Sequence, residues 1–259
     1  MQSMVPQTFQ SSHPSGVDIL RDGFLAHMFG VFTELFFQSL LKTSVRSLPV
    51  QFPLHGWPSA FALSQGAVTS LQPNVVDAYQ YPYLLLDLLV NTAIGPVVPQ
   101  TLWVPRSSRD LAQYVLEATL ELPIFFVRND GGIGITVADA SAGNSASLLG
   151  STRAVNVGGR TSVHLRIQWP GYKEWRRQFQ TRDETAARSV ITLDRFIRHV
   201  GRSLDRFLEA MSSEIPDGFP QWRIGPNAIG RQDITIVGVA HVSSGSWMPI
   251  LQLTRPLLV

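Results

Sequence analysis

The segment GPNAIGRQ, from Gly225 to Gln232, has the glycine spacing of a phosphate-binding loop. Such a loop needs a lysine to reach the β- and γ-phosphates of a nucleotide and a serine or threonine to hold magnesium. Arg231 and Gln232 occupy those two positions here, and no strand clearly precedes the segment. An ordinary loop is therefore the better interpretation.

The other candidate side chains lack the spacing that cofactor binding, nucleophilic catalysis or metal binding requires. The glycines of GGIGI lie in a predicted turn, so they do not form a dinucleotide-binding motif. No Gly-x-Ser-x-Gly sequence exposes a serine nucleophile, and no pair among His13, His27, His55, His164, His199 and His241 has the spacing of a metal motif. Cysteine is absent, which excludes disulfides and thiolate chemistry. We predict no catalytic residue, metal or cofactor from local motifs, although an acid–base pair assembled from distant residues would leave no local pattern.

Arginine is the residue type with the strongest potential for binding. Arg160 to Arg206 contains eleven basic and five acidic residues, a net charge of +6, whereas the whole chain has a net charge of +2. Arginine forms bidentate contacts with carboxylates and phosphates, and pooled positive charge attracts anionic partners. We predict that four arginines share one accessible face that binds an acidic protein or a nucleic acid: Arg176, Arg177, Arg198 and Arg202.

Two alternatives to a binding face stay open at this point. The arginines could be structural, paired with nearby carboxylates or stacked on Tyr172 and Trp175. The protein could also be an enzyme whose active site forms between two lobes from residues that are distant in sequence. A non-catalytic interaction protein is the interpretation that the arginine content favours.

A hairpin and a helix are the elements that must position these arginines. VHLRIQW alternates apolar and polar residues as a half-buried strand does, and Pro170-Gly171 suits the centre of a type II turn. The returning segment carries Trp175 and Phe179; a helix would also fit it, but the turn favours a second strand. A helix follows from about Thr192 to Met211, with one apolar stripe that consists of Leu193, Phe196, Ile197, Val200, Leu204, Phe207, Leu208 and Met211. ITIVGVAHV and WMPILQL form a last hairpin around residues 243–246.

The preceding part of the chain is divided by glycines and prolines. Residues 1–16 form a loose tail, and residues 17–48 are predicted to be helical. Eight prolines between residues 49 and 105 leave room for one regular element, at 83–93. A helix from Ser107 or Ser108 to Leu120 and a hairpin around Asn129–Gly132 come next. Residues 140–161 are rich in glycine and serine and predict a flexible loop between two lobes.

The predicted fold class is therefore α+β: a helical N-terminal part, then β-hairpins packed with an amphipathic helix. The lobes would be residues 17–139 and 162–259, unless the chain forms a single domain. Residues 23–41 have the length of a membrane span, but His27 and Glu34 inside it favour a buried helix. No signal peptide is visible in the first sixteen residues. We expect an intracellular protein, in the cytoplasm or nucleus, with no membrane span.

The strings WPGYKEWRRQFQTRD, ITLDRFIRHVGRSLDRF and HVSSGSW resemble a family of uncharacterised proteins from mushroom-forming basidiomycete fungi, and PIFFVRNDGGIGI fits the same pattern. The resemblance covers patches between Pro123 and Leu253 and nothing in the first hundred residues. It implies a fungal, intracellular protein. It implies no activity.

Overall fold

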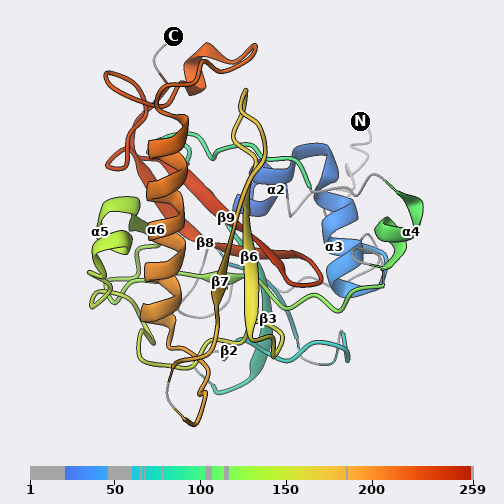
Figure 1. Ribbon diagram of the computed structural model, residues 1–259. Coiled ribbons are helices and arrows are strands. Elements are labelled where there is room, and N and C mark those ends of the chain that lie inside the picture. The colour runs from blue at the N-terminus through green and yellow to red at the C-terminus, as the bar shows by residue number, and fades with distance from the viewer. Residues whose placement is uncertain are drawn as a thin grey trace, which may run out of the picture.

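A six-stranded sheet lies at the centre of the computed structural model, which describes residues 21–45, 60–64, 66, 68–76, 79–102, 107–113, 117–184 and 186–257 (Figure 1). The strand order is β4-β8-β9-β6-β7, and β5 also pairs with β8. The strands are β4 (Ile124–Phe125), β5 (Ile135–Thr136), β6 (Ser162–Ile167), β7 (Trp175–Gln180), β8 (Ile234–Ser243) and β9 (Ser246–Leu253).

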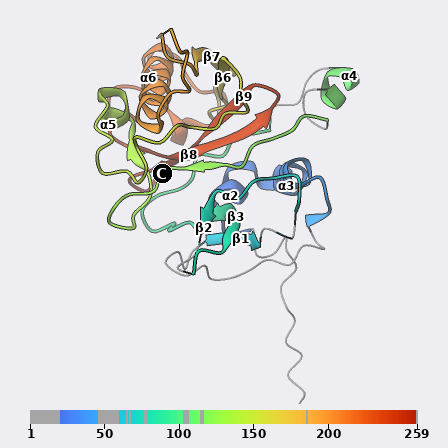
Figure 2. The same cartoon turned by 90° about the horizontal axis from the view of Figure 1, so that it is seen from below.

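Helices cover both faces of this sheet, and two hydrophobic cores result (Figure 2). The helices α5 (Val137–Ala142) and α6 (Leu193–Met211) lie on one face. On the other face lie α2 (Phe24–Phe29), the 3-10 turn Gly30–Phe32, α3 (Thr33–Leu41) and a three-stranded sheet of order β1-β3-β2, formed by β1 (Ala60–Ser64), β2 (Val75–Val76) and β3 (Pro82–Leu88). The predicted α+β class is confirmed.

The hairpin of β6 and β7 confirms the prediction made from its alternation and its turn. The six residues of β6 pair with those of β7 in antiparallel register from Ser162↔Gln180 to Ile167↔Trp175. Gly171 has φ 80°, and the Tyr172 N–H donates to the Trp169 carbonyl at 3.0 Å. This is the geometry of a type II turn, which needs a residue that tolerates positive φ at its third position.

The helix α6 begins where its sequence predicts. The Thr192 side chain accepts a hydrogen bond from the Arg195 N–H at 3.4 Å, as an N-cap does. Its apolar stripe packs on the hairpin, with the Phe196 ring 5.7 Å from Phe179 and the Phe207 ring 5.9 Å from Trp175. The second predicted hairpin is also present, because β8 and β9 pair up to Ser243↔Ser246.

The N-terminal part differs from the expectation of long helices. The predicted helix over 17–48 is interrupted at Gly30, whose φ of 52° is incompatible with a continuous α-helix; residues 17–20 and 46–48 lie outside the described residues. The predicted element at 83–93 is largely β3, and the three-stranded sheet to which it belongs was not predicted. The helix capped by Ser107 is α4 (Ser108–Leu111), and residues 114–116 of the predicted helix lie outside the described residues.

A buried carboxylate joins the small sheet to α2. Asp87 of β3 is fully buried and accepts hydrogen bonds from the Leu25 N–H at 2.9 Å and the Leu88 N–H at 2.8 Å. Burial raises the pKa of Asp87 to about 8, and backbone N–H donors that include Leu25 and Leu88 oppose this rise. Because Gly23 provides no side-chain cap for α2, Asp87 takes over the unpaired donors of its first turn.

The stretch Phe24–Leu41 has the length and composition to cross a membrane, with a mean hydropathy of 1.4. Fifty-six per cent of it is buried inside the protein, and a core helix of a soluble protein passes the same test. The feature is therefore weak evidence for a membrane span.

The predicted seam at residues 140–161 does not divide the central sheet. β4 and β5 precede it, β8 and β9 follow it, and all four belong to one sheet. Residues 140–142 are the end of α5, and later residues are held by hydrogen bonds such as Leu149 N–H to the Val127 carbonyl at 2.8 Å. The two cores thus lie on opposite faces of the same sheet, and the mobility of this segment stays a prediction. The predicted tail, residues 1–16, lies outside the described residues.

Candidate functional site

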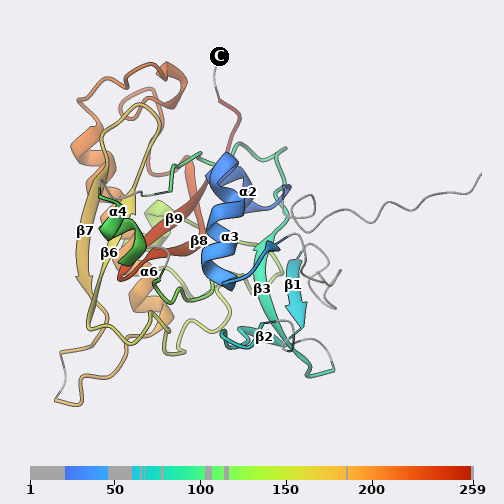
Figure 3. The same ribbon diagram turned by 90° about the vertical axis from the view of Figure 1, so that its right-hand side faces the viewer.

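β7 separates two of the four arginines that the sequence placed on one face. It forms the outer edge of the sheet, beside α6 (Figure 3). Trp175, Arg177 and Phe179 point toward α6, because alternate residues of a strand share a face. Arg176 therefore points to the opposite face, where its register partner is Arg166. Arg176 does not belong to a shared surface with Arg177.

Arg198 is four residues before Arg202 on α6, but its guanidinium is directed toward α5. It is on the flank of α6 that faces α5, and its guanidinium packs so closely on Gly143 that a Cβ there would lie 2.1 Å from Nη2. Its Nε is buried and has no hydrogen-bond partner among the described residues. Arg198 thus packs at the α5–α6 contact and is partly exposed, and its part in binding stays a prediction.

Arg177 and Arg202 are in contact with each other, and their role in binding stays a prediction. The Arg177 Nη1 donates to the Arg202 carbonyl at 3.4 Å, which brings the strand residue against the flank of α6. Partial burial lowers the pKa of Arg177, and the positive charges of Arg206 and Arg202 lower it further. Like charges are therefore close enough here to disfavour one another.

Arg177 lies beside a row of basic side chains along α6. Arg195, His199, Arg202 and Arg206 follow each other at steps of four, three and four residues, so they share one flank of the helix. We name these four residues together with Arg177 the basic stripe. Sequence reasoning missed Arg195, His199 and Arg206, although their helical spacing was visible.

His199 shows how strongly the basic stripe is positive. Its ring stacks on Phe179 at 5.1 Å with an interplanar angle of 9°. Burial lowers the pKa of His199, and Arg195, Arg177, Arg202 and Arg198 add to the effect. His199 is consequently neutral near pH 7, and four arginines surround it.

Two carboxylates of α6 are engaged outside the basic stripe, whereas Glu209, three residues after Arg206, continues the same flank of the helix. Asp194 accepts a hydrogen bond from the Ser145 hydroxyl, and Asp205 forms an ion pair with Arg231 at 3.5 Å. In the described part of the chain, no ion pair joins a member of the basic stripe to a carboxylate. The stripe therefore presents several positive charges that have no ion-paired carboxylate, on a strand and a helix that pack together.

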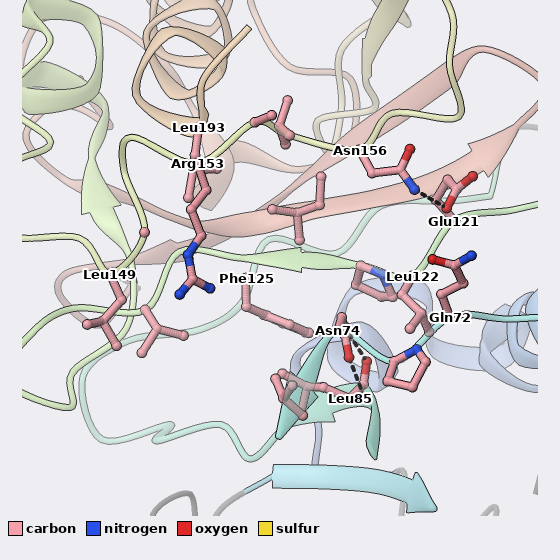
Figure 4. Close-up of a pocket in the computed structure, with 18 of the residues that line it drawn as sticks. Gln72, Asn74, Leu85, Glu121, Leu122, Phe125, Leu149, Arg153, Asn156 and Leu193 are labelled. Atoms are coloured by element: carbon pink, nitrogen blue, oxygen red, sulfur yellow. Dashed lines mark hydrogen bonds between the residues drawn. The ribbon is translucent and has the colours of Figure 1, made fainter. Parts of the chain in front are cut away.

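A second candidate site is a pocket of about 720 Å³ between the three-stranded sheet and β4 (Figure 4). We name it the β4 pocket. Its walls come from residues 71–76 with Leu85, from residues 121–125 with Val127, and from residues 149–150 and 153–156 with Leu193. The segment rich in glycine and serine thus contributes to a cavity, as the enzyme alternative required.

The polar groups of the β4 pocket are mostly satisfied by one another. The Asn156 Nδ2 donates to Glu121 Oε2 at 2.8 Å, and the Leu85 N–H donates to Asn74 Oδ1 at 2.8 Å. Glu121 is the only carboxylate among the described residues that line the pocket, and no histidine lines it. The enzyme alternative therefore gains no support from this pocket, because a general acid–base pair is not assembled there.

His241 lies behind Glu121 in the core. Its Nδ1 accepts the Glu121 N–H at 2.8 Å, and its ring stacks on Trp247 at 4.5 Å. Burial lowers the pKa of His241 to about 4, with a further decrease from Arg160 and an opposing contribution from the Ser243 carbonyl. A neutral, buried imidazole that accepts a backbone N–H has a structural role.

Among the described residues, no group of three or more His, Asp or Glu side chains is placed to hold a metal ion. Comparison of the chain with protein-family models, with curated proteins and with solved structures finds no match.

Proposed function

We propose that this protein is a non-catalytic interaction protein that binds an acidic partner through the basic stripe. The observation that carries the proposal is the meeting of Arg177 from β7 with Arg202 and Arg206 from α6, where like charges crowd one another. In the described part of the chain no carboxylate forms an ion pair with these arginines. A partner that supplies carboxylates would relieve the repulsion on binding.

The packing beneath the basic stripe supports binding of a partner with matching charge spacing, rather than non-specific attraction of any anion. Phe179 and Phe196 pack the strand against the helix beneath the charges, so the spacing of the arginines is fixed before a partner arrives. Such preorganisation reduces the entropy that binding must overcome. The stripe from Arg195 to Arg206 spans three turns of α6, or about 16 Å.

An acidic protein segment fits this surface better than a nucleic acid does. Surfaces for single-stranded nucleic acids combine positive charge with exposed aromatic rings on which bases stack. The rings on the Arg177 face of β7 leave little surface for stacking, because Phe179 is buried under His199 and Trp175 is half-buried against Phe207. Acidic side chains at helical spacing on a partner would match the row of arginines, each pair forming a charge-assisted hydrogen bond. The basidiomycete resemblance adds to this proposal an intracellular fungal setting for the partner.

The test is a fluorescence-anisotropy titration with a labelled twelve-residue peptide that contains six glutamates, compared with a labelled DNA oligonucleotide. The double variant Arg202→Glu with Arg206→Glu should weaken peptide binding at least about tenfold, because it reverses two of the charges that attract the peptide. Arg176→Glu is the control for a single reversal, Arg202→Glu, since Arg176 is next to Arg177 on β7 but points to the opposite face of the sheet. Equal losses in these two single variants, or tighter binding of DNA than of the peptide, would contradict the proposal.

A further inference from the structure

The wall of the β4 pocket is mostly apolar and large enough for a small molecule. Its volume of about 720 Å³ lies within the range of about 300–1,000 Å³ that is typical of ligand sites. Figure 4 shows the side chains of three separate segments converging on one space. The larger apolar members of the wall include Leu71, Leu85, Leu122, Phe125, Leu149 and Leu193.

Arg153 is the single cationic side chain among the described residues of this lining. Its backbone is fixed on both sides, because the Arg153 N–H donates to the Gly150 carbonyl at 2.9 Å and the Arg153 carbonyl accepts the Leu193 N–H at 2.8 Å. Its side chain extends from the loop toward the apolar wall near Leu149 and Phe125 (Figure 4). The guanidinium has no hydrogen bond or ion pair with any described residue.

An unpaired guanidinium above an apolar wall selects the chemistry of a ligand. The planar fork of arginine matches the two oxygens of a carboxylate and forms two parallel hydrogen bonds with it. One arginine supplies one such fork, and Glu121 in the same lining would repel a second negative charge. The site therefore suits a ligand with one negative charge and an apolar remainder.

We propose that the β4 pocket binds a small monocarboxylic acid with an apolar body, whose carboxylate is held by Arg153. The apolar body lies against Phe125, Leu85 and Leu122, which removes its surface from water. This site is separate from the basic stripe, which lies across α6 and β7.

Isothermal titration calorimetry with decanoate, below the concentration at which it forms micelles, tests this proposal. The neutral probe is 1-decanol, which has the same chain length. Arg153→Gln should weaken decanoate binding on the order of tenfold, because the charge-assisted pair is lost, while decanol binding stays unchanged. Arg223→Gln is the matched control, an exposed arginine outside the pocket lining, and should leave both affinities unchanged.

A second variant tests the place of the apolar body. Leu149 is 50% exposed, so Leu149→Trp should be tolerated by the fold while its larger side chain obstructs the pocket and weakens both decanoate and decanol. A melting curve for each variant shows that it is folded. The proposal is overturned if decanoate shows no saturable binding, or if Arg153→Gln binds it as wild type does. Decyl phosphate binding more tightly than decanoate would overturn the assignment of a carboxylate.

Discussion

At the scale of single residues, His241 makes the stability of the protein depend on pH. The imidazole has an ordinary pKa of 6.5 and a folded-state pKa of about 4, so between these values the unfolded chain binds a proton that the folded protein does not. The contribution of His241 is fully present above pH 6.5 and decreases as the pH falls toward 4. A pKa difference of this size corresponds to about 3 kcal/mol for a buried group.

The variant His241→Phe isolates this contribution, because phenylalanine can still stack on Trp247 but cannot be protonated. Wild type should be more stable than His241→Phe at pH 7, where the Glu121 N–H keeps its acceptor. The difference in their free energies of unfolding should shrink between pH 7 and pH 4. Urea unfolding at several pH values measures it, and a difference that is independent of pH would show that His241 titrates normally.

Gly201 is a residue whose replacement has two opposing effects. Alanine favours a helix interior by about 1 kcal/mol over glycine. However, a Cβ at position 201 would lie 2.5 Å from the Ser141 nitrogen and 2.6 Å from the Ala140 carbonyl carbon, both in the α5 backbone. Overpacking against backbone costs about 1–3 kcal/mol. We expect Gly201→Ala to lower the melting temperature, and an increase would mean that α5 does not pack as closely on α6.

At the scale of elements, the apolar face of α6 packs into the hydrophobic core between α5, α6 and the six-stranded sheet. Phe196 and Leu204 are completely buried on its apolar face. Phe196→Ala should cost about 3–5 kcal/mol and Leu204→Ala about 2–5 kcal/mol, because each change leaves a cavity. Glu209→Ala on the exposed flank is the control and should stay within about 0.5 kcal/mol of wild type. Denaturant unfolding measures the free energy of unfolding of each variant. A core variant that is as stable as the control would contradict this packing.

Much of the C-terminal half could be predicted because its signals are local. Pro170-Gly171 fixes a turn and Thr192 caps a helix, whatever the rest of the chain does. The three-stranded sheet could not be predicted in this way. β1 is buried along most of its length and so shows no alternation, and its partner β3 lies about twenty residues later in the sequence. Pairing across that distance leaves no pattern in either segment alone.

The candidate sites, like the fold, contain some features that the sequence predicts and others that it does not. Arg176 and Arg177 are neighbours on a predicted strand, so their opposite directions followed from the sequence and should have excluded a common face. The row from Arg195 to Arg206 was also readable from helical spacing. The position of Arg198 against Gly143 and the walls of the β4 pocket depend on packing between distant segments, which no local pattern encodes.

At the scale of the whole molecule, the residues that hold the fold lie apart from those that we propose bind a partner. Two cores on the two faces of one sheet supply stability. The basic stripe lies outside them, on the flank of α6 beside the sheet's outer edge. If that division is right, the arginines of the stripe are not needed for folding, and their mutual repulsion slightly opposes it.

The free energy of unfolding of Arg202→Glu tests this claim most directly, because it requires no knowledge of the partner. Arg202 lies near Arg177 and within one helical turn of Arg206. A negative charge at position 202 should therefore attract Arg177 and Arg206, whereas the native arginine repels them. We predict stability equal to or up to about 1 kcal/mol above wild type in low salt, and no difference in 1 M salt, where such interactions are screened. A loss of more than about 1 kcal/mol would show that Arg202 is paired within the protein, and would contradict the assignment of the stripe to a partner.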